Sequence, residues 1–479
     1  MASPTSATCF HLGASLPRWD VDKRTGFVPT RPPLGRLPPG FEAWEAVLES
    51  AVKLKLQLSE QVEKMGEEKR SKEEDKSRLW RKSVGEMPLL SIDGLKISYE
   101  QLYRAHHVLV FNLHFFSHTI PSAESIVIPR SLAIPLFQVS KYLQVPPIIT
   151  YFDITLHNWR PLNSLPDGSI PPIHSLQCQT TFTSTPDEDE FHLLSTRIEL
   201  RGAEALECVK LAVEKALIAK DSALEQAAEY LERGVSVIQD LRELMLGIKG
   251  RIDPEIFYNE VRPWLGGADG DLWGRPWVFE GSEEIEEWPQ RWYLSGATAA
   301  QSPLMRALDI YLGVVGDGGQ SSSYSAQAGK ESFQERMLSY MTPQHRTFLE
   351  RLRQSPHQLR ALVQQVVQER GMDAPIVKAF NSAVKALKEF RDAHMVVVTL
   401  LVVGPARRAA RKAAEGADPL LADGSGSAGD REKDEKMMQQ AFGGGDDSSD
   451  KGALKGTGGT DLVRFLKGVR DQTTRAYLQ

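Results

Sequence analysis

The chain has 479 residues, of which 41% are hydrophobic, enough for two ordinary domains with buried cores. The formal net charge is -6, and no basic stripe is interleaved with aromatic residues, so charge gives no reason to expect nucleic acid or an anionic membrane as a partner. The three cysteines, Cys9, Cys178 and Cys208, lie far apart, which argues against a zinc site or a disulfide framework and favours a reducing compartment.

No targeting or membrane segment is evident in the sequence. The first nineteen residues lack a charged start followed by an apolar run, so we expect no secretory signal. A transit peptide is the alternative, because these residues are rich in Ser and Thr and poor in acid. The most apolar run, Met395 to Val403, is far shorter than the ~20 residues that cross a bilayer. We therefore expect a cytoplasmic protein with no membrane partner.

The N-terminal part is predicted to be helical after an extended, proline-rich arm over 1–40. Residues 41–82 have a helical composition, with a dense mix of Glu, Lys and Arg from Ser59 onward. Such a mix is typical of a solvated helix face, and a partner-binding surface is the alternative. A turn and a further helix are predicted over 89–113. No carboxylate or cysteine joins the nearby histidines at metal-site spacing, so packing or surface roles are favoured for His106, His107, His114 and His118.

A domain boundary is predicted near residue 180. The segment from Ile128 to Trp159 is broken at Pro146-Pro147, and 160–189 has the Pro, Ser, Thr and Asp content of a linker. We therefore predict a small domain over 1–180 and a large one over 181–479. Nearly every strong element is helical, so the predicted fold class is mainly α.

Two short segments of the second part carry candidate ligand contacts. Phe257, Val261 and Arg262 lie on or beside one face, and an arginine beside aromatic rings offers a clamp for a carboxylate. An arginine that snorkels at the surface is the alternative. The small residues from Ser295 to Ser302 allow close approach of a flat ligand; a tight helix crossing or a helix cap is the alternative.

The strongest candidate site is an amphipathic helix predicted over 379–398. Phe380 and Val384 begin an apolar stripe that recurs at steps of three and four residues. His394 falls on this stripe, and Arg391 lies one turn earlier. This pair suits a haem, with iron on the imidazole nitrogen and a propionate on the guanidinium. A core histidine hydrogen-bonded to a backbone carbonyl is the alternative.

The C-terminal region is predicted to contain flexible loops and a final helix. Residues 404–455 are low-complexity and predict a flexible insertion, and 316–329 predict a Gly/Ser-rich loop. The run from Gly456 to Asp461 lacks the Lys-Ser/Thr of a P-loop, so nucleotide binding is not expected. With Thr460 as a helix N-cap, its N–H groups could instead receive a carboxylate or a haem propionate.

Several of these stretches together resemble the indoleamine 2,3-dioxygenase family. The resemblance runs in order from about Leu16 to the C-terminus. The 404–455 insertion and the charged early helix suggest a fungal-type member. The matching stretches are Ile128–Trp159, Ser295–Gly313, Tyr340–Leu349, Leu387–Thr399 and Lys455–Leu466.

The resemblance implies a small N-terminal domain that covers the distal side of the pocket and a large, all-helical haem domain. It implies a monomeric haem b enzyme that inserts O2 across the indole 2,3 bond of L-tryptophan and gives N-formylkynurenine. This reaction is the first step of the kynurenine pathway toward NAD, and it needs a reductant that the sequence does not identify.

The resemblance also implies a role for each candidate residue. His394 would be the proximal iron ligand, and Arg262 would hold the substrate carboxylate. The other haem contacts would be Arg391 on a propionate, Asp309 in support of it, Thr298 and Ala299. The other substrate contacts would be Tyr151, Phe191, Phe257 and Tyr258 around the indole, Ser195 near the distal iron face, and Thr457 in a mobile lid. No general acid or base is assigned.

Two departures from the family pattern bear on the substrate. Ala297, Ala299 and Ala300 stand where more glycine is usual, so extra methyl groups would narrow the pocket. His192 stands where an aromatic residue is usual. The alternative function is a haem protein on the same scaffold that binds O2 or senses haem without efficient tryptophan turnover. Arg262 favours the dioxygenase, because an oxygen carrier has no need for a carboxylate clamp. A helical scaffold without haem is the third interpretation.

Overall fold

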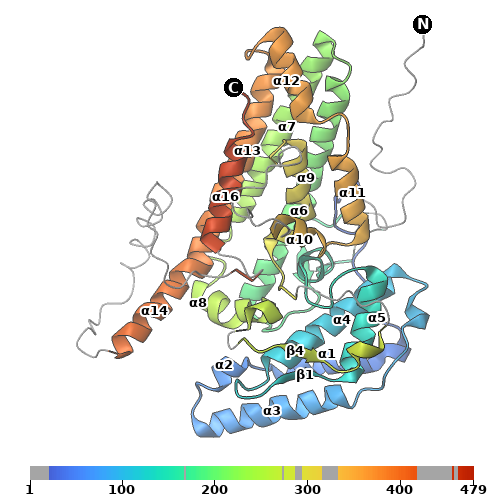
Figure 1. Cartoon of the computed structure of the whole chain (residues 1–479), viewed down its shortest axis with the longest axis vertical. Helices are drawn as coiled ribbons and strands as arrows, with labels where there is room; N and C mark the ends of the chain where they lie inside the picture. Colours follow the sequence, from blue (N-terminus) through green and yellow to red (C-terminus); the bar gives the residue numbers. More distant parts are fainter. Residues whose placement is uncertain are drawn as a thin grey trace.

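The computed structural model in Figure 1 is built almost entirely of helices, and the prediction of a mainly helical fold is confirmed. The structure describes residues 21–164, 166, 169–271, 274–285, 294–314, 333–417, 456–457 and 462–479. The predicted loop over 316–329 and the first half of the predicted N-terminal arm lie outside these residues.

A central helix, α4 (Tyr99–His118), organises the N-terminal part. It is surrounded by η1 (Pro39–Phe41), α1 (Glu42–Leu54), α2 (Ser59–Val62), α3 (Glu67–Gly85), η2 (Asp93–Leu95), β1 (Ile126–Ile128) and α5 (Arg130–Leu143). Ser98 caps α4 by accepting a hydrogen bond from the Gln101 amide at 3.4 Å. Buried residues then follow without interruption from Leu102 to Ser117. A helix buried on all sides is a core helix, and α4 packs against α1 and α5.

Helix α3 is the solvated, charged helix that the sequence predicts. Only Ser77, Trp80 and Val84 are buried along its length. Its charges form pairs three residues apart, such as Arg78 with Asp75 at 2.8 Å, and these pairs are mostly exposed. Exposed pairs of this kind stabilise a helix by a few tenths of a kcal/mol at most, about 0.3 kcal/mol each, so α3 is held mainly by its few buried side chains.

The described residues contain two pairs of short strands, and one of these pairs, β1 with β4, joins the two parts of the chain. β2 (Trp159–Pro161) pairs antiparallel with β3 (Leu176–Cys178), and β1 pairs parallel with β4 (Trp277–Phe279). The predicted linker is therefore partly paired. It also ends earlier than predicted, because a helix begins at Pro186, where Thr185 caps the first turn and proline suits the first helical position.

Three long helices form the frame of the C-terminal part. α6 (Pro186–Ala216), α7 (Asp221–Leu246) and α13 (Pro375–Val398) lie side by side in Figure 1, and both α6 and α13 pack along α7. The other elements are α8 (Pro254–Ile256), η4 (Phe257–Val261), η5 (Arg262–Leu265), η6 (Ala268–Gly270), η7 (Ser282–Glu284), η8 (Ala299–Gln301), α9 (Pro303–Tyr311), α10 (Phe333–Leu338), α11 (Pro343–Arg353), α12 (Leu359–Arg370), η9 (Thr399–Val403), α14 (Gly404–Ala417) and α16 (Leu462–Thr474).

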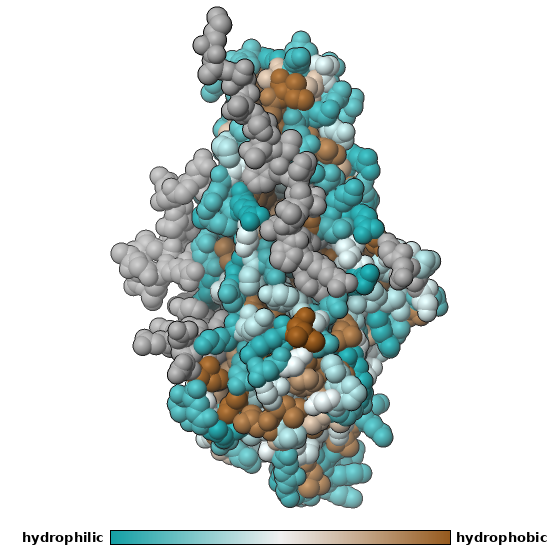
Figure 2. All heavy atoms as spheres, turned by 90° about the vertical axis from the view of Figure 1, so that its right-hand side faces the viewer, coloured by the Kyte–Doolittle hydropathy of each residue, from teal (hydrophilic) through white to brown (hydrophobic). Residues whose placement is uncertain are grey.

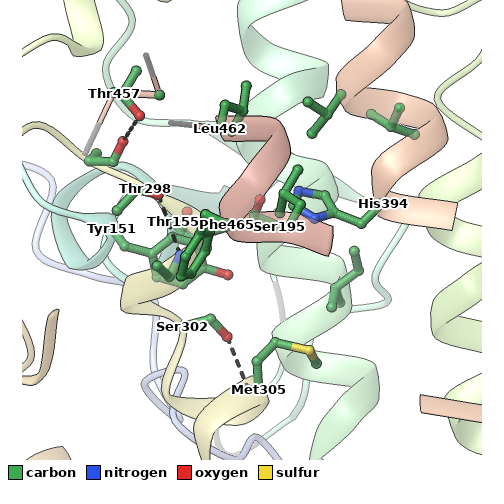
Figure 3. A pocket seen from close by; sticks show the side chains of 18 of the residues that line it. Tyr151, Thr155, Ser195, Thr298, Ser302, Met305, His394, Thr457, Leu462 and Phe465 are labelled. Carbon is green, nitrogen blue, oxygen red and sulfur yellow. Dashed lines mark hydrogen bonds between the residues drawn. The ribbon is translucent and has the colours of Figure 1, made fainter. Parts of the chain in front are cut away.

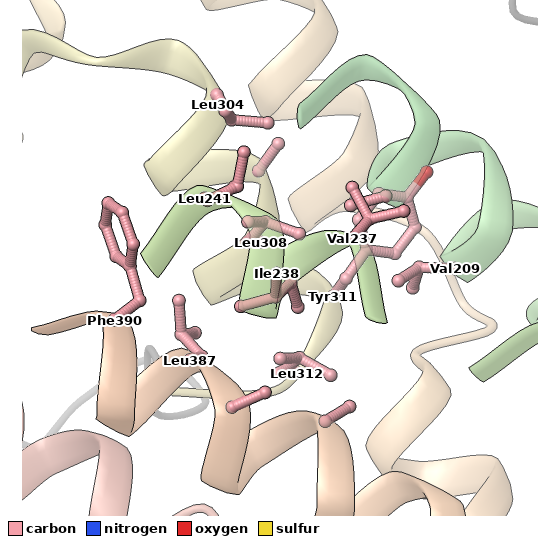
Figure 4. Close-up of a cluster of buried hydrophobic side chains, with 14 of the residues drawn as sticks. Val209, Val237, Ile238, Leu241, Leu304, Leu308, Tyr311, Leu312, Leu387 and Phe390 are labelled. Carbon is pink, nitrogen blue, oxygen red and sulfur yellow. The ribbon is translucent and has the colours of Figure 1, made fainter. Parts of the chain in front are cut away.

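Aliphatic side chains from α7, α9 and α13 meet in the core of this part (Figure 4). Leu241 of α7, Leu308 of α9 and Leu387 of α13 are each fully buried. Burying such a side chain contributes about 2 kcal/mol. This packing fixes α9 against α13, which matters because the two helices carry facing polar residues of the candidate site.

Buried hydrophobic residues divide into two clusters along the chain. One is drawn mainly from residues 28–182 and the other mainly from 194–478. A few residues cross this division, among them Trp264 and Tyr340, which belong to the first cluster. The division into separate domains at residue 180 stays a prediction.

The helical run from Pro375 to Lys412 is long and apolar enough to cross a membrane, by length and composition alone. Residues beyond Met395–Val403 therefore extend the apolar stretch that the sequence indicated. Its apolar side chains, including Phe380, Leu387 and Leu401, pack in the core of the C-terminal part. We interpret the run as a core helix.

The predicted flexible insertion begins with a helix. α14 covers Gly404–Ala417 and continues the line of α13 and η9 in Figure 1. The prediction of a loop from residue 404 is wrong for this stretch, because its alternating Ala, Arg and Lys residues have high helix propensity despite their low complexity. Residues 418–455 lie outside the described part of the chain.

Hydrophilic side chains predominate on the face in Figure 2, and its hydrophobic side chains gather mainly in the lower part. Among the exposed hydrophobic residues of the whole chain are Leu79, Leu89 and Ile97 of the N-terminal part. Singly exposed residues of this kind are ordinary on protein surfaces.

Candidate functional site

A cavity of about 290 Å³ lies where α6, α9, α13 and α16 come together (Figure 3). Most of its lining is apolar. The apolar side chains include Ile154, Leu194, Ile198, Met245, Ile248, Leu265, Phe390, Val397, Leu401 and Phe465. A dry, apolar cavity with a few polar groups is the usual form of a site for a large planar ligand.

Nearly all the candidate residues named from the sequence line this one cavity. The residues that do so are Tyr151, Phe191, Ser195, Phe257, Arg262, Thr298, Ala299, Asp309, Arg391, His394 and Thr457. They come from six separate segments, so the fold brings together residues that are far apart in the chain. Tyr258 is the candidate that does not line the cavity.

His394 offers a neutral imidazole to the cavity. It lies on α13, which begins with Pro375 at its first position and buries an apolar stripe against α7. Among the described residues, none forms a hydrogen bond with either ring nitrogen. Burial, and then the positive charge of Arg391, lowers the pKa of His394 to about 4. The ring is therefore neutral at neutral pH, with a nitrogen lone pair free to bind a metal.

Arg391 is fixed beside His394 by contacts from two other helices. It forms an ion pair with Asp309 of α9, and both side chains are about nine-tenths buried. It also donates to the hydroxyl of Thr473 and, at 3.5 Å, to the carbonyl of Val469, both on α16. The predicted partnership of Arg391 with Asp309 is thus present, and one guanidinium joins α9, α13 and α16.

A π-helical turn presents Phe257 and Arg262 to the cavity together. The Arg262 amide donates to the Phe257 carbonyl, five residues back, so the two side chains lie on one side of the turn. Tyr258 is rotated away, and its ring packs 5.6 Å from the Arg262 guanidinium. Tyr258 is not among the described residues that line the cavity, so its place around the indole, which the resemblance implies, stays a prediction. Burial lowers the pKa of Arg262, which remains charged.

Aromatic side chains form one wall. The rings of Phe191 on α6 and Phe257 on η4 lie 4.5 Å apart between centroids. Ser195 follows Phe191 by one turn, so its hydroxyl enters the same cavity (Figure 3). Such a wall suits a flat aromatic ligand, because ring pairs at this separation attract one another.

A second wall, which contains Thr298 and Ala299, is held by close backbone contacts. Gly267 and Gly296 cross so tightly that a Cβ on either would lie within about 2 Å of a backbone oxygen, 2.0 Å and 1.9 Å respectively. The backbone is also held at Ser295, because its amide donates a hydrogen bond to the Tyr340 hydroxyl at 3.0 Å. Thr298 and Ala299 follow directly and line the cavity.

Thr457 lies against this wall. Its hydroxyl donates to the Ala297 carbonyl at 2.7 Å, and its own carbonyl accepts from the Gly296 amide at 3.1 Å (Figure 3). The two contacts attach the segment before α16 to the edge of the cavity. The predicted N-cap Thr460 and its neighbours 458–461 lie outside the described residues.

The departures from the family pattern divide into two kinds. Ala297, Ala299 and Ala300 do line the cavity, and the narrowing of the pocket by their methyl groups stays a prediction. His192 is not among the described lining residues. It is buried on the other side of α6, with Nε2 3.4 Å from the Glu188 carboxylate.

The histidines of the N-terminal part have packing roles, as the sequence favoured. Each is buried or half-buried and bonded: His106 to Asp153 at 2.7 Å, His107 to Thr180 at 2.9 Å, His114 to the Trp264 carbonyl at 2.7 Å and His118 to the Gly266 carbonyl at 3.0 Å. Across the described residues, no group of three or more His, Cys, Asp or Glu side chains could hold a metal ion.

Sequence reasoning missed several residues of the cavity. Ser302 lines the cavity and caps α9 with its side chain, at 3.2 Å from the Met305 amide; the sequence offered a helix cap here but not a place in the cavity. Phe465 lies on the apolar face of α16, which periodicity could have found. Arg306 lines the cavity but pairs with Glu335 at 3.1 Å, and its spacing carries no signal.

The residues present fit a haem. A haem carries four of its own iron ligands, so the protein must supply one unpaired imidazole, an apolar slot and cations for the propionates. His394, the apolar lining and Arg391 meet these three needs.

The chain matches the family model described as indoleamine 2,3-dioxygenase over residues 15–476. It is 30% identical to indoleamine 2,3-dioxygenase 2 of Homo sapiens, over 82% of this chain and 84% of the relative. It is 27% identical to indoleamine 2,3-dioxygenase nanC of Aspergillus nanangensis, over 96% and 97%. The identity to indoleamine 2,3-dioxygenase of Saccharomyces cerevisiae is 27%, over 82% and 86%.

Fold, cavity and these matches define a helical, haem-dependent oxidoreductase. The chain belongs to the indoleamine 2,3-dioxygenase family, which supports a dioxygenase that acts on indoles. Identity to these fungal relatives is no higher than to the human one, so the comparisons establish the family and not a fungal subtype.

Proposed function

We propose that this chain is a haem b dioxygenase that inserts both atoms of O2 across the indole 2,3 bond of L-tryptophan and releases N-formylkynurenine. The observation that carries the proposal is the presence, in one cavity, of the His394 imidazole, which bonds to no other described residue, and the Arg262 guanidinium. An imidazole would serve any haem protein, whereas a guanidinium beside an aromatic wall suits an aromatic amino acid.

The haem, when bound, supplies the oxygen chemistry. His394 would hold its iron through a ring nitrogen, and Arg391, oriented by Asp309, would hold a propionate. These contacts would hold the haem in the cavity, and α6 would supply the substrate contacts Phe191 and Ser195.

The substrate contacts follow from charge and shape. Arg262 would bind the carboxylate through its fork of N–H groups, while Phe191 and Phe257 would hold the indole ring. Thr457, which is bonded to the backbone of Gly296 and Ala297, would help to exclude water once the site is filled. These residues orient the indole, and no side chain is assigned to move a proton.

The test is product formation by the haem-loaded protein. With L-tryptophan, O2 and a chemical reductant, the wild type should form N-formylkynurenine. His394→Ala should lose the histidine-ligated haem spectrum. Arg262→Ala should keep that spectrum and raise KM about tenfold to a hundredfold, because a charged hydrogen bond is lost.

Arg353→Ala is the matched control, because Arg353 is half exposed on α11 and pairs only with Glu350 of its own helix among the described residues. It should behave as the wild type. A normal haem spectrum without product from L-tryptophan would refute the proposal and favour reversible oxygen binding or haem sensing.

A further inference from the structure

Glu199 is a buried carboxyl group directly behind the cavity wall, and the proposed reaction does not use it. It lies on α6 one turn after Ser195 and is 1% exposed. Its Oε1 accepts two hydrogen bonds, from the Tyr151 hydroxyl at 3.0 Å and from the Ser302 hydroxyl at 2.6 Å. Across the described residues, no hydrogen bond reaches Oε2. A buried carboxyl oxygen without a hydrogen bond lowers the stability of the folded protein, so its presence here needs an explanation.

The two donors belong to different parts of the site. Tyr151 lines the cavity, and its backbone amide is held by Gln301 at 2.8 Å. Ser302 caps α9, the helix that presents Asp309 to Arg391. Glu199 therefore joins the wall around the substrate to the helix that orients the predicted propionate contact.

Glu199 can change its charge near neutral pH. Burial raises its pKa to about 7, although the hydrogen bonds from Ser302 and Tyr151 favour the charged form. Burial also raises the pKa of Tyr151 well above its usual value, so the phenol stays neutral and keeps its proton to donate.

The other charged groups on the facing elements are engaged elsewhere. On α9, Arg306 pairs with Glu335 and Asp309 with Arg391. Beside Tyr151, the carboxylate of Asp153 binds His106 and the Thr150 amide and hydroxyl. Of the titratable groups that the structure describes, Tyr151 is the one that bonds to Glu199.

We propose that Glu199 is a positioning residue for the substrate: its charged carboxylate holds Tyr151 and Ser302 in the cavity wall, and the substrate binds more weakly once that charge is lost. The physical reason is that a hydrogen bond to a carboxylate is roughly twice as strong as one to a neutral acid. The inference rests on the proposed tryptophan dioxygenase function.

The test is the pH dependence of KM for L-tryptophan in the haem-loaded protein between about pH 6 and pH 8. Wild-type KM should rise as the pH falls through about 7, with kcat nearly constant. Glu199→Gln keeps the size and an acceptor oxygen but removes the charge. Its KM should be about fivefold above wild type at the upper pH and should not vary with pH.

Three further variants separate positioning from damage. Tyr151→Phe should raise KM at the upper pH, and the double variant Tyr151→Phe with Glu199→Gln should add little to it, because both remove one interaction. Glu214→Gln, a half-exposed glutamate on the same helix, should match the wild type at every pH. The thermal midpoint of Glu199→Gln at the upper pH should be no lower than that of the wild type, because the variant removes a buried charge.

Two results would overturn the inference: a wild-type KM that does not change with pH, or a Glu199→Gln variant whose KM follows the wild-type profile. If the wild type makes no product, the proposed reaction fails on its own. The dissociation constant of L-tryptophan, followed by the ferric haem spectrum, must then show the same pH dependence and the same variant effects, or this inference fails too.

Discussion

At the scale of single residues, the site depends on buried charges that are held by partners. Arg391 is the clearest case, because its guanidinium contacts Asp309 on one side and the Thr473 hydroxyl on the other. Because these contacts already fix the guanidinium, it would lose little conformational entropy on binding a propionate. We therefore expect Asp309 to act by orienting Arg391 and not by contacting the haem itself.

Asp309→Ala should leave the Arg391 charge buried without its carboxylate. We expect the free energy of unfolding of the haem-free protein to fall by about 3 kcal/mol, measured by urea denaturation. The haem-loaded variant should also lose haem faster to an excess of a haem-scavenging apoprotein.

Asp221→Ala is the control, because Asp221 is exposed and pairs with Arg370 at the surface. Its loss should cost less than about 1 kcal/mol. Equal losses for the two variants would contradict the role of the buried pair.

At the scale of elements, the positions of α6 and α9 decide where the polar residues meet. The two helices approach at Gly202, where a Cβ would lie 2.2 Å from the Cδ2 of Leu304. Leu304 is itself buried in the core, so it has no free space to move into. The absence of a side chain at Gly202 thus brings Glu199 within reach of Ser302.

Gly202→Ala should destabilise the protein by about 1–2 kcal/mol, since the strain of overpacking exceeds the gain in helix propensity. Gly234→Ala on α7 is the matched control, because a Cβ there would make an ordinary contact with Cys208 at 3.5 Å. That variant should gain up to about 1 kcal/mol. Urea midpoints that shift in the same direction for both variants would refute this account.

Local periodicity is sufficient to find His394 and Arg391, because both lie on a regular amphipathic helix. It does not indicate the π-helical turn over Phe257–Val261, which brings Phe257 and Arg262 to one side of the turn. Glu199 is missed for another reason. A glutamate within a helix normally faces solvent, and only the tertiary contacts with Tyr151 and Ser302 reveal its burial.

At the scale of the whole molecule, the described residues form two hydrophobic clusters, and the cavity draws residues from both. Tyr151 and Ala297 belong to the first cluster, and most of the remaining hydrophobic lining belongs to the second. Composition could not predict this arrangement, because it depends on the folded-back segments 265–267 and 294–298.

Neutral histidines buried in both parts make stability depend on pH. Burial lowers the pKa of His157 and of His345 to about 3 in each case. The unfolded chain binds protons at these positions below about pH 6.5, whereas the folded chain does not, so stability is full above that pH and falls below it.

At about pH 5, each of these two histidines should remove about 2 kcal/mol from the free energy of unfolding. Urea denaturation of the wild type at about pH 7 and about pH 5 measures the total change, to which other buried titratable groups such as His118 and His394 also contribute. The variant His345→Gln should lose less stability on acidification than the wild type does. Identical losses in the two proteins would exclude His345 as a source of the effect.

The central claim is that O2 is inserted into the indole ring of L-tryptophan. The direct test supplies the haem-loaded protein with ¹⁸O-labelled O2 in unlabelled water and measures the mass of the product by mass spectrometry. We expect N-formylkynurenine that carries both heavy oxygen atoms. A product with one heavy atom or none, or O2 bound without any product, would contradict it.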